Sequence, residues 1–213
     1  MSDEILKLRK EYQKAALDES HTHADPFEQF NHWFAEALNA GLDEPNAFVL
    51  STADKDGHPS ARIVLLRDAT DRGFTFFTNY KSRKGREISE NPAACFTFFW
   101  HALERQVRLE GKLEKLPESD SDSYFSIRPK GSQIGAWASP QSEQIASRAE
   151  LETREEKYQT QFGDAPIPRP PHWGGYILIP DYLEFWQGRE NRLHDRICYE
   201  LSGSEWKRFR LAP

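Results

Sequence analysis

The sequence is short of the features that identify several classes of protein. Its 213 residues include only two cysteines, Cys95 and Cys198, whose spacing fits neither a zinc site nor a disulfide framework. We therefore expect two buried thiols in a reducing compartment. No apolar run is as long as a membrane span, and the charged stretch 1–10 is unlike a secretory signal. These absences predict a cytoplasmic protein without a bound metal.

The chain also lacks an excess of positive charge. Its formal net charge is −6, which argues against a general nucleic-acid binder. No glycine-rich fingerprint follows a predicted strand, so dinucleotide and Walker-type phosphate sites have no support. No nucleophile elbow accompanies the serine, histidine and aspartate residues. Aromatic residues, in contrast, make up 13% of the chain, which is ample for a globular core.

The spacing of apolar residues changes from helical to strand-like near residue 47. Before this point, Asp25 and Pro26 are typical of the start of a helix, apolar residues follow at helical spacing as far as Leu38, and Gly41 ends it. After it, short β-prone segments are separated by hairpin signals such as Asp56-Gly57. We predict strands at 47–53, 61–67, 74–79, 94–100, 105–116, 175–179, 182–186, 192–200 and 206–211. Further helices are predicted at 82–90, 117–127 and 142–161, with a loop at 129–140.

These elements favour a mainly β fold with peripheral helices. Hairpins dominate and the early strands lack crossover helices, so the strands should pair antiparallel in a Greek-key-like sheet that closes into a barrel. We expect an N-terminal arm or helix over 1–20 and a single domain over 21–213.

An unusual set of cations lies in or beside the predicted strands. Arg62, Arg67 and Arg196 stand inside β-prone runs, where a guanidinium needs either solvent or an anion. Arg83 and Lys84 crowd the start of a predicted helix, where a bound anion would offset their clash with the helix dipole. An anion site and a set of ordinary surface ion pairs both agree with this pattern.

The run from Arg192 to Arg196 carries a second cluster of charge. If it is a strand, alternate residues share a face, so Arg192, His194 and Arg196 project together. Leu193 and Ile197 then point the other way, into apolar packing. Two guanidiniums and an imidazole would suit an anion and proton transfer, but an exposed edge-strand face is an equal alternative.

Several stretches, taken in order, resemble the pyridoxine (pyridoxamine) 5′-phosphate oxidase family from about Leu8 to Pro213. Any one of them alone would be weak, and their sequence order makes the resemblance specific. The matching stretches are 62–66, 77–79, 82–84, 100 with 103–107, 124–125 with 128–129, 132–136, 141–142, 173–175, 184–188 and 192–196.

The resemblance implies an FMN-binding split β-barrel that works as a homodimer, with the flavin at the subunit interface. It implies oxidation of pyridoxine or pyridoxamine 5′-phosphate to pyridoxal 5′-phosphate in vitamin B6 metabolism. Dioxygen would be the acceptor, and hydrogen peroxide and, from the amine, ammonia the products. Another split-barrel FMN reductase or a flavin carrier is the alternative, but it would lack Tyr124, Arg128, Arg192 and His194. A nucleic-acid or phosphoprotein binding module is opposed by the acidic total charge.

The resemblance also implies the site residues. The expected FMN contacts are Arg62, Ile63, Val64, Leu65, Leu66, Arg67, Phe77, Thr78, Arg83, Lys84, Gln106, Gln141, Ser142, Trp186 and Arg196. The expected substrate contacts are Arg9, Tyr12, Arg67, Tyr124, Arg128, Ser132, Arg192 and His194. Arg192 and His194 would be the catalytic pair and would act chiefly by orienting the substrate.

Some positions depart from the family pattern. Arg67 replaces a usual lysine, Phe77 a common tyrosine, and Ala15 and Ala16 two glycines of the arm. Arg62 and Arg67 are five residues apart, so an uninterrupted strand would point them to opposite faces. Either the strand carries a bulge or the two arginines meet different groups.

Overall fold

The computed structural model describes residues 11–213 of the chain. These residues divide into two compact units, and each is described by itself. Of the described residues, unit 1 comprises 11–49, 95–111 and 180–213, and unit 2 comprises 50–94 and 112–179. Two long strands, β6 (Arg105–Lys115) and β7 (Trp173–Gln187), each begin in one unit and end in the other.

The α-helix of unit 1, α2 (Pro26–Asn39), begins where the sequence predicts. The Asp25 side chain accepts hydrogen bonds from the backbone N–H groups of Phe27 and Glu28, which caps the helix. The buried face carries Phe30 and Trp33. The ring of Trp33 meets the Phe185 ring edge-on at 5.3 Å, so the helix packs on the C-terminal half of β7.

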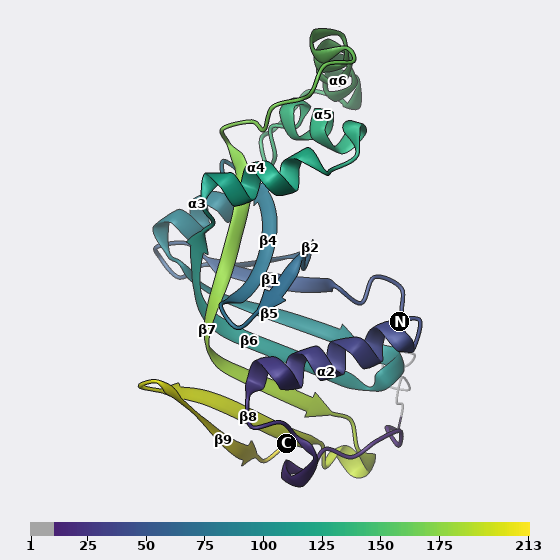
Figure 1. The fold of residues 1–213 in the computed structure, drawn as a ribbon, viewed down its shortest axis with the longest axis vertical. Helices are drawn as coiled ribbons and strands as arrows, with labels where there is room; N and C mark the ends of the chain where they lie inside the picture. Colours follow the sequence, from purple (N-terminus) through teal and green to yellow (C-terminus); the bar gives the residue numbers. More distant parts are fainter. Residues whose placement is uncertain (1–10) are drawn as a thin grey trace. The chain divides into compact units, whose positions relative to one another are not determined.

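A hairpin of two strands, β8 (Asp195–Ser202) and β9 (Glu205–Leu211), ends the chain beside β7 (Figure 1). Both pairings are antiparallel, and Trp186 lies opposite Arg196. β7 also continues through Pro180, although the sequence predicts two separate strands here. A proline removes one hydrogen-bond donor, but its fixed backbone angle remains compatible with an extended chain.

The predicted strand at 192–200 starts too early. Asn191 and Arg192 have backbone φ angles of 54° and 61°, which lie in the left-handed region and cannot extend a strand. They belong to a short 3-10 turn, η3 (Glu190–Arg192), and β8 begins only at Asp195. The face that we expected Arg192, His194 and Arg196 to share is therefore absent.

In unit 2, β4 (Gly73–Asn79) pairs antiparallel with the first half of β7 and with β3 (Asp68–Thr70), a short strand that the sequence did not predict. Phe77 lies opposite Gly175, where an added Cβ would stand 2.9 Å from the Phe77 ring. The glycine therefore makes room for this aromatic side chain.

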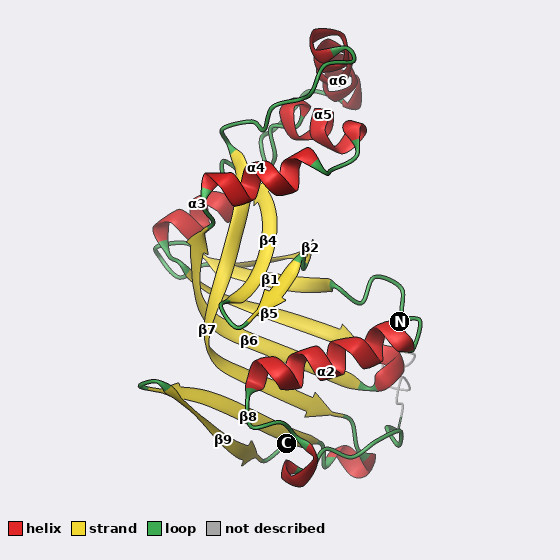
Figure 2. Ribbon diagram, in the orientation of Figure 1, coloured by secondary structure: helices red, strands yellow, loops and turns green. Residues whose placement is uncertain are grey.

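Four helices belong to the described part of unit 2 (Figure 2). They are α3 (Arg83–Glu90), α4 (Glu118–Ser126), α5 (Lys130–Ala138) and α6 (Arg148–Phe162). The predicted loop at 129–140 is wrong, because α5 occupies most of it. Gly131 and Gly135 lower the intrinsic helix propensity of this segment, but Ile134 and Ala138 are buried and stabilise the helix through packing. Helix α6 begins later than predicted, where Ser147 caps it.

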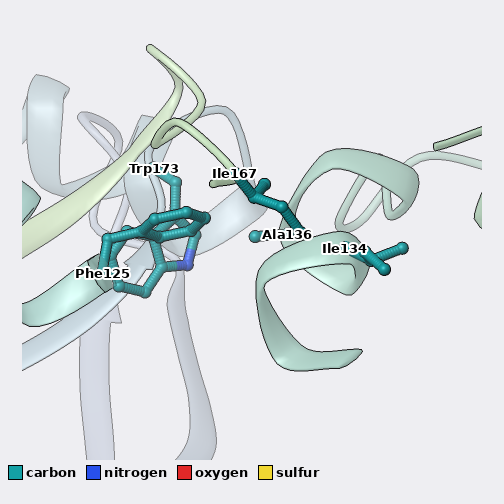
Figure 3. Close-up of a cluster of buried hydrophobic side chains, with 5 residues drawn as sticks. All are labelled: Phe125, Ile134, Ala136, Ile167 and Trp173. Atoms are coloured by element: carbon teal, nitrogen blue, oxygen red, sulfur yellow. The ribbon is translucent and has the colours of Figure 1, made fainter. Parts of the chain in front are cut away.

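A small apolar core joins α4, α5 and the start of β7. Figure 3 shows its five buried side chains, Phe125, Ile134, Ala136, Ile167 and Trp173. The rings of Phe125 and Trp173 meet edge-on at 5.2 Å. This cluster holds the C-terminal end of α4 in place, which bears on the position of the neighbouring Tyr124 and Arg128.

The strands form hydrogen-bonded neighbours in the order β2-β1-β5-β6-β7-β4-β3, with β8 beside β7 and β9 beside β8. The three strands not yet placed are β1 (Ala47–Ala53), β2 (Pro59–Leu65) and β5 (Ala93–Trp100). Two further 3-10 turns are η1 (Glu19–His21) and η2 (His101–Leu103). Residues 11–213 include no helix that is both long and apolar enough to cross a membrane. The single domain over 21–213 stays a prediction.

Candidate functional site

A cavity of about 500 Å³ in unit 2 collects half of the residues predicted to touch a cofactor or substrate. Among its described lining residues, four side chains are cationic and none is acidic, which suits an anionic ligand. Eleven of the twelve lining residues are predicted contacts, and Trp173 is the exception. The lining is Arg62, Ile63, Val64, Leu65, Arg67, Phe77, Thr78, Lys84, Tyr124, Arg128, Gln141 and Trp173.

Arg62 and Arg67 both line this cavity, so they do not face opposite ways. β2 ends at Leu65, and the N–H of Arg67 donates to the backbone oxygen of Thr75 at 2.8 Å. The chain has thus left β2 before Arg67, and the strand alternation that would separate the two arginines no longer applies.

One end of the cavity lies beside the start of α3. The Ser82 hydroxyl accepts from the Gly85 N–H at 3.3 Å and donates to the Asn79 oxygen at 2.7 Å, which fixes this turn. Lys84 is half-buried, and burial together with the charge of Arg62 lowers the pKa of its amine. A bound anion would relieve both effects.

Arg62 is held by a buried carboxylate. Its Nη1 donates to the Thr52 hydroxyl at 2.6 Å, and its Nη2 lies 3.3 Å from the Glu87 Oε2 and also bonds to Ser60. On the other carboxylate oxygen, the Arg83 Nε donates at 2.7 Å. Burial would raise the pKa of Glu87, but the bonds from Ser60, Thr52 and Arg83 and the charge of Arg62 lower it to about 2.

The opposite wall is aromatic and carries Arg128. Its guanidinium carbon lies 4.5 Å from the centroid of the Trp173 ring, and the Phe77 and Tyr124 rings stack at 4.0 Å. The Arg128 Nη1 is buried and finds no hydrogen-bond partner among the described residues. Burial lowers the pKa of this guanidinium, and the nearby charge of Arg67 lowers it further. Such a donor is suited to an anion from outside the protein.

Four predicted contacts of unit 2 lie outside this lining. Leu66 is buried, whereas the side chains of Arg83, Ser132 and Ser142 are exposed. Ser132 belongs to the first turn of α5, where free N–H groups favour an anion. Ser142 has a backbone φ of 68°, an uncommon conformation for a residue with a side chain.

In unit 1, the predicted contacts Tyr12, Trp186 and His194 form a cluster of rings. The Trp186 and His194 centroids are 4.6 Å apart, and Tyr12 meets them edge-on at 5.8 and 6.0 Å. Gly188 makes room for this arrangement, because a Cβ there would stand 2.7 Å from the Tyr12 ring. The predicted contact Arg9 lies outside the described residues.

Two carboxylates tie the segment that carries Tyr12 to the rest of unit 1. The Glu104 side chain accepts from the N–H groups of Gln13 and Lys14 at 2.9 and 3.1 Å. The Asp195 side chain accepts from the Leu17 N–H at 3.0 Å. Tyr12 is thereby held beside His194 without a helix or strand at this point of the chain.

His194 has a defined tautomer. Its Nδ1 accepts from the Arg189 N–H at 3.0 Å, so a neutral ring carries its proton on Nε2. Burial and the charge of Arg192 lower the pKa of the imidazole, which favours the neutral form. Arg192 itself is exposed, and Leu193 is 70% exposed rather than packed in an apolar core.

Arg196 is held by an ion pair within β7 and β8. Its Nε and Nη2 donate to the two oxygens of Glu184 at 3.0 and 2.8 Å. Glu184 is buried and also accepts from Arg108 at 3.0 Å. Gln106, in β6, is half-buried. These predicted flavin contacts, like Trp186, belong to unit 1.

The residues that sequence reasoning missed are supporting ones: Glu87, Glu184 and Trp173. The four-residue spacing of Arg83 and Glu87 in a predicted helix could have suggested an ion pair. The hydroxyls that complete the Glu87 site come from β1 and β2, and no local pattern connects them with α3.

Comparison with known proteins places this geometry in context. A family model described as pyridoxamine 5′-phosphate oxidase matches residues 34–162, and one described as pyridoxine 5′-phosphate oxidase C-terminal dimerisation region matches 173–213. Proteins named pyridoxine/pyridoxamine 5′-phosphate oxidase from Cupriavidus necator and Burkholderia mallei are 54% and 57% identical. The alignments cover 99% and 98% of this chain and 99% of each relative.

Two solved structures are similar as well. PhzG from Burkholderia lata, in complex with tetrahydrophenazine-1-carboxylic acid, has a TM-score of 0.87 and 34% identity over 93% of this chain and 98% of its own. A pyridoxamine 5′-phosphate oxidase-related, FMN-binding protein from Nostoc punctiforme has a TM-score of 0.70 over 86% of this chain and 97% of its own. At 19% identity the second likeness concerns the fold alone. The fold class predicted from the sequence, a mainly β split barrel with helices, is confirmed.

Proposed function

The chain belongs to the pyridoxamine 5′-phosphate oxidase family and is an oxidoreductase of that family, and we propose that it oxidises pyridoxine and pyridoxamine 5′-phosphate to pyridoxal 5′-phosphate. FMN is the proposed cofactor and dioxygen the acceptor, so the products are hydrogen peroxide and, from the amine, ammonia. The observation that carries the proposal is the cavity of unit 2, whose described lining has four cations and no acid, and in which the buried Nη1 of Arg128 meets no partner among the described residues.

The donors near α3 fit the phosphate of FMN. Arg62 and Lys84 supply charge and Thr78 a hydroxyl, and the lining has no carboxylate that would repel an anion. Phe77 keeps the ring but not the hydroxyl of the tyrosine common in the family, so its proposed contact is through the backbone. FMN, when bound, supplies the hydride acceptor, and the protein supplies binding and alignment.

A second phosphate, that of the substrate, fits the aromatic wall. Arg128 offers a charged donor whose Nη1 meets no acceptor within residues 11–213, and Tyr124 adds a hydroxyl. Arg67 adds a second charge, and Ser132 a hydroxyl in the first turn of α5. Two phosphates explain why one cavity carries four cations, since each would be balanced by two of them.

The proposed role of Arg192 and His194 is to orient the pyridine ring. A neutral His194 with its proton on Nε2 can donate one hydrogen bond to a substrate atom. Arg192, on an exposed turn with a left-handed backbone, adds a charge that a substrate could meet. Tyr12 and Arg9 are proposed to cover the bound substrate.

The match of 173–213 to a dimerisation region supports a homodimer, which we propose holds the flavin at the subunit interface. A cytoplasmic location is proposed as well, in keeping with the free cysteines Cys95 and Cys198.

The proposed function is tested by spectroscopy and turnover of the purified protein. We expect a flavin absorption spectrum, and oxygen consumption with formation of pyridoxal 5′-phosphate when either phosphorylated substrate is added. A protein that binds no FMN contradicts the proposal, as does one whose flavin is reduced by nicotinamide cofactors but not by these substrates. A parallel assay with a reduced phenazine carboxylate separates this activity from one related to the ligand of PhzG.

A further inference from the structure

We propose that Glu87 is a positioning residue, which aligns Arg62 and Arg83 for the flavin phosphate through one shared carboxylate. The proposal rests on FMN binding in the unit 2 cavity. Of the three residues only Arg62 lines that cavity. The Glu87 side chain is only 5% exposed, whereas that of Arg83 is 58% exposed. A buried carboxylate between two partly exposed guanidiniums can fix their directions without touching the ligand itself.

Each carboxylate oxygen of Glu87 contacts a different arginine. Oε1 accepts from the Arg83 Nε at 2.7 Å, along one face of α3. Oε2 accepts from the hydroxyl of Ser60 at 2.6 Å and from the Arg62 Nη2 at 3.3 Å, across from β2. Because Thr52 also bonds to both Glu87 and Arg62, the Arg62 guanidinium is held from more than one side. This network leaves little rotational freedom to a side chain that would otherwise be flexible.

The charges around Glu87 explain why a positioning carboxylate is needed. Arg62, Arg83 and Lys84 bring three positive charges together, and Glu87 brings one negative charge. The remaining excess of two is what a phosphate group balances, since a phosphate monoester carries about −1.5 to −2 near pH 7. Without Glu87, the neighbouring cations would repel each other and turn toward solvent.

Two effects of Glu87 on FMN affinity have opposite signs, and an experiment can separate them. By charge alone, the carboxylate repels a phosphate, so its neutralisation would strengthen FMN binding. By positioning, its loss releases Arg62 and Arg83, and FMN binding weakens. We expect positioning to outweigh repulsion, because Glu87 accepts from the Arg83 Nε at 2.7 Å and holds Arg62 both directly, at 3.3 Å, and through the hydroxyls of Thr52 and Ser60.

The test is Glu87→Gln, which keeps the shape of the side chain but removes its charge. The affinities of the full-length apoprotein for FMN and for riboflavin are measured by quenching of flavin fluorescence. We expect FMN binding to weaken by about tenfold or more, as for the loss of a charged hydrogen bond, while riboflavin binding is unchanged. Glu90→Gln is the matched control: the same change on an exposed position of the same helix, with no expected effect.

Two results would overturn the proposal: FMN binding as tight as in the wild type or tighter, and an equal loss of FMN and riboflavin affinity. If Glu87→Gln does not fold, Glu87→Asp keeps the charge on a shorter side chain. It should weaken FMN binding alone, and unchanged FMN binding in Glu87→Asp would count against positioning. Wild-type protein that binds no FMN would overturn the proposed function. If the wild type binds FMN and Glu87→Gln binds it equally well, only this inference is overturned.

Discussion

Arg128 has a buried guanidinium nitrogen, Nη1, that finds no hydrogen-bond partner among the described residues. A buried guanidinium normally has a carboxylate or a full set of acceptors, because transfer of a charge out of water is costly. Here the centroids of the Trp173 and Phe125 rings lie 4.5 and 5.6 Å from the guanidinium carbon, and these cation–π contacts offset part of that cost. The Nη1 group has no partner among the described residues and remains for a ligand, while burial and the charge of Arg67 lower the pKa of the side chain.

We therefore expect Arg128→Gln to raise KM for pyridoxine 5′-phosphate by about 10- to 100-fold, the worth of a charged hydrogen bond of about 1.5–3 kcal/mol. The effect on kcat should be smaller, because the phosphate is remote from the reacting carbon. Steady-state oxygen consumption gives both constants. Lys130→Gln is the control, since Lys130 is exposed and pairs with Asp164 at 3.2 Å. An unchanged KM in Arg128→Gln would remove this residue from the phosphate site.

The reduced pKa of His194 has a consequence for stability. A histidine whose pKa is lowered below its usual 6.5 in the folded protein binds protons more readily when unfolded. Its contribution to the free energy of unfolding is present above pH 6.5 and is lost as the pH falls through the folded-state pKa. Denaturant unfolding at pH 8 and pH 5.5 should thus show a larger loss for the wild type than for His194→Gln. Equal losses would mean that the pKa of His194 is the same in the two states.

Among the elements, α3 lies unusually close to the turn before it. A Cβ added at Gly85 would stand 2.2 Å from the backbone oxygen of Tyr80, a distance that only backbone movement can relieve. Gly85 therefore has a packing role in spite of its low helix propensity, and it lets the start of α3 lie against the Tyr80 turn.

The two effects of Gly85→Ala oppose each other. Alanine favours a helix by about 1 kcal/mol relative to glycine, but overpacking against fixed backbone costs about 1–3 kcal/mol. We expect a net loss in the free energy of unfolding, measured by denaturant titration. In the control Gly135→Ala, the added Cβ meets nothing within 4 Å, so this substitution in α5 should stabilise by about 0.5–1 kcal/mol. Stabilisation by Gly85→Ala would show that the Tyr80 turn can move freely.

For the whole molecule, the four cations that line the unit 2 cavity make the free energy of unfolding depend on an anionic ligand. Arg62, Lys84, Arg67 and Arg128 repel one another in a cavity without a carboxylate among its described lining residues. FMN at one hundred times its Kd should raise the free energy of unfolding by about 2.7 kcal/mol. For a chain of this size that is a rise in Tm of about 5–10 °C, measured by thermal unfolding. Riboflavin should give a smaller rise in Tm. An equal rise would mean that the phosphate of FMN does not contribute to the stabilisation.

Some elements and site residues could be predicted from the sequence alone, and others could not. Helix α2 and strand β1 begin where it predicts, because a proline after a capping aspartate and a short apolar, β-prone run are local signals. Eleven of the twelve residues that line the unit 2 cavity were also predicted, though from ordered motifs that resemble a family rather than from periodicity. Periodicity alone missed α5 and predicted a loop there, because its glycines lower the helix propensity of a segment that tertiary packing stabilises as a helix.

The charged side chains show what only the tertiary structure decided. The sequence places Arg83 and Glu87 in one predicted helix and Arg62 in a predicted strand, but it does not say that one carboxylate serves both arginines. It also predicts a shared strand face for Arg192 and His194, whereas the left-handed backbone at Arg192 ends that alternation. Amino-acid order determined the inventory of cations and the antiparallel strands, since these depend on local composition and spacing. Which charge meets which depends on contacts between residues far apart in the chain, and those exist only in the folded protein.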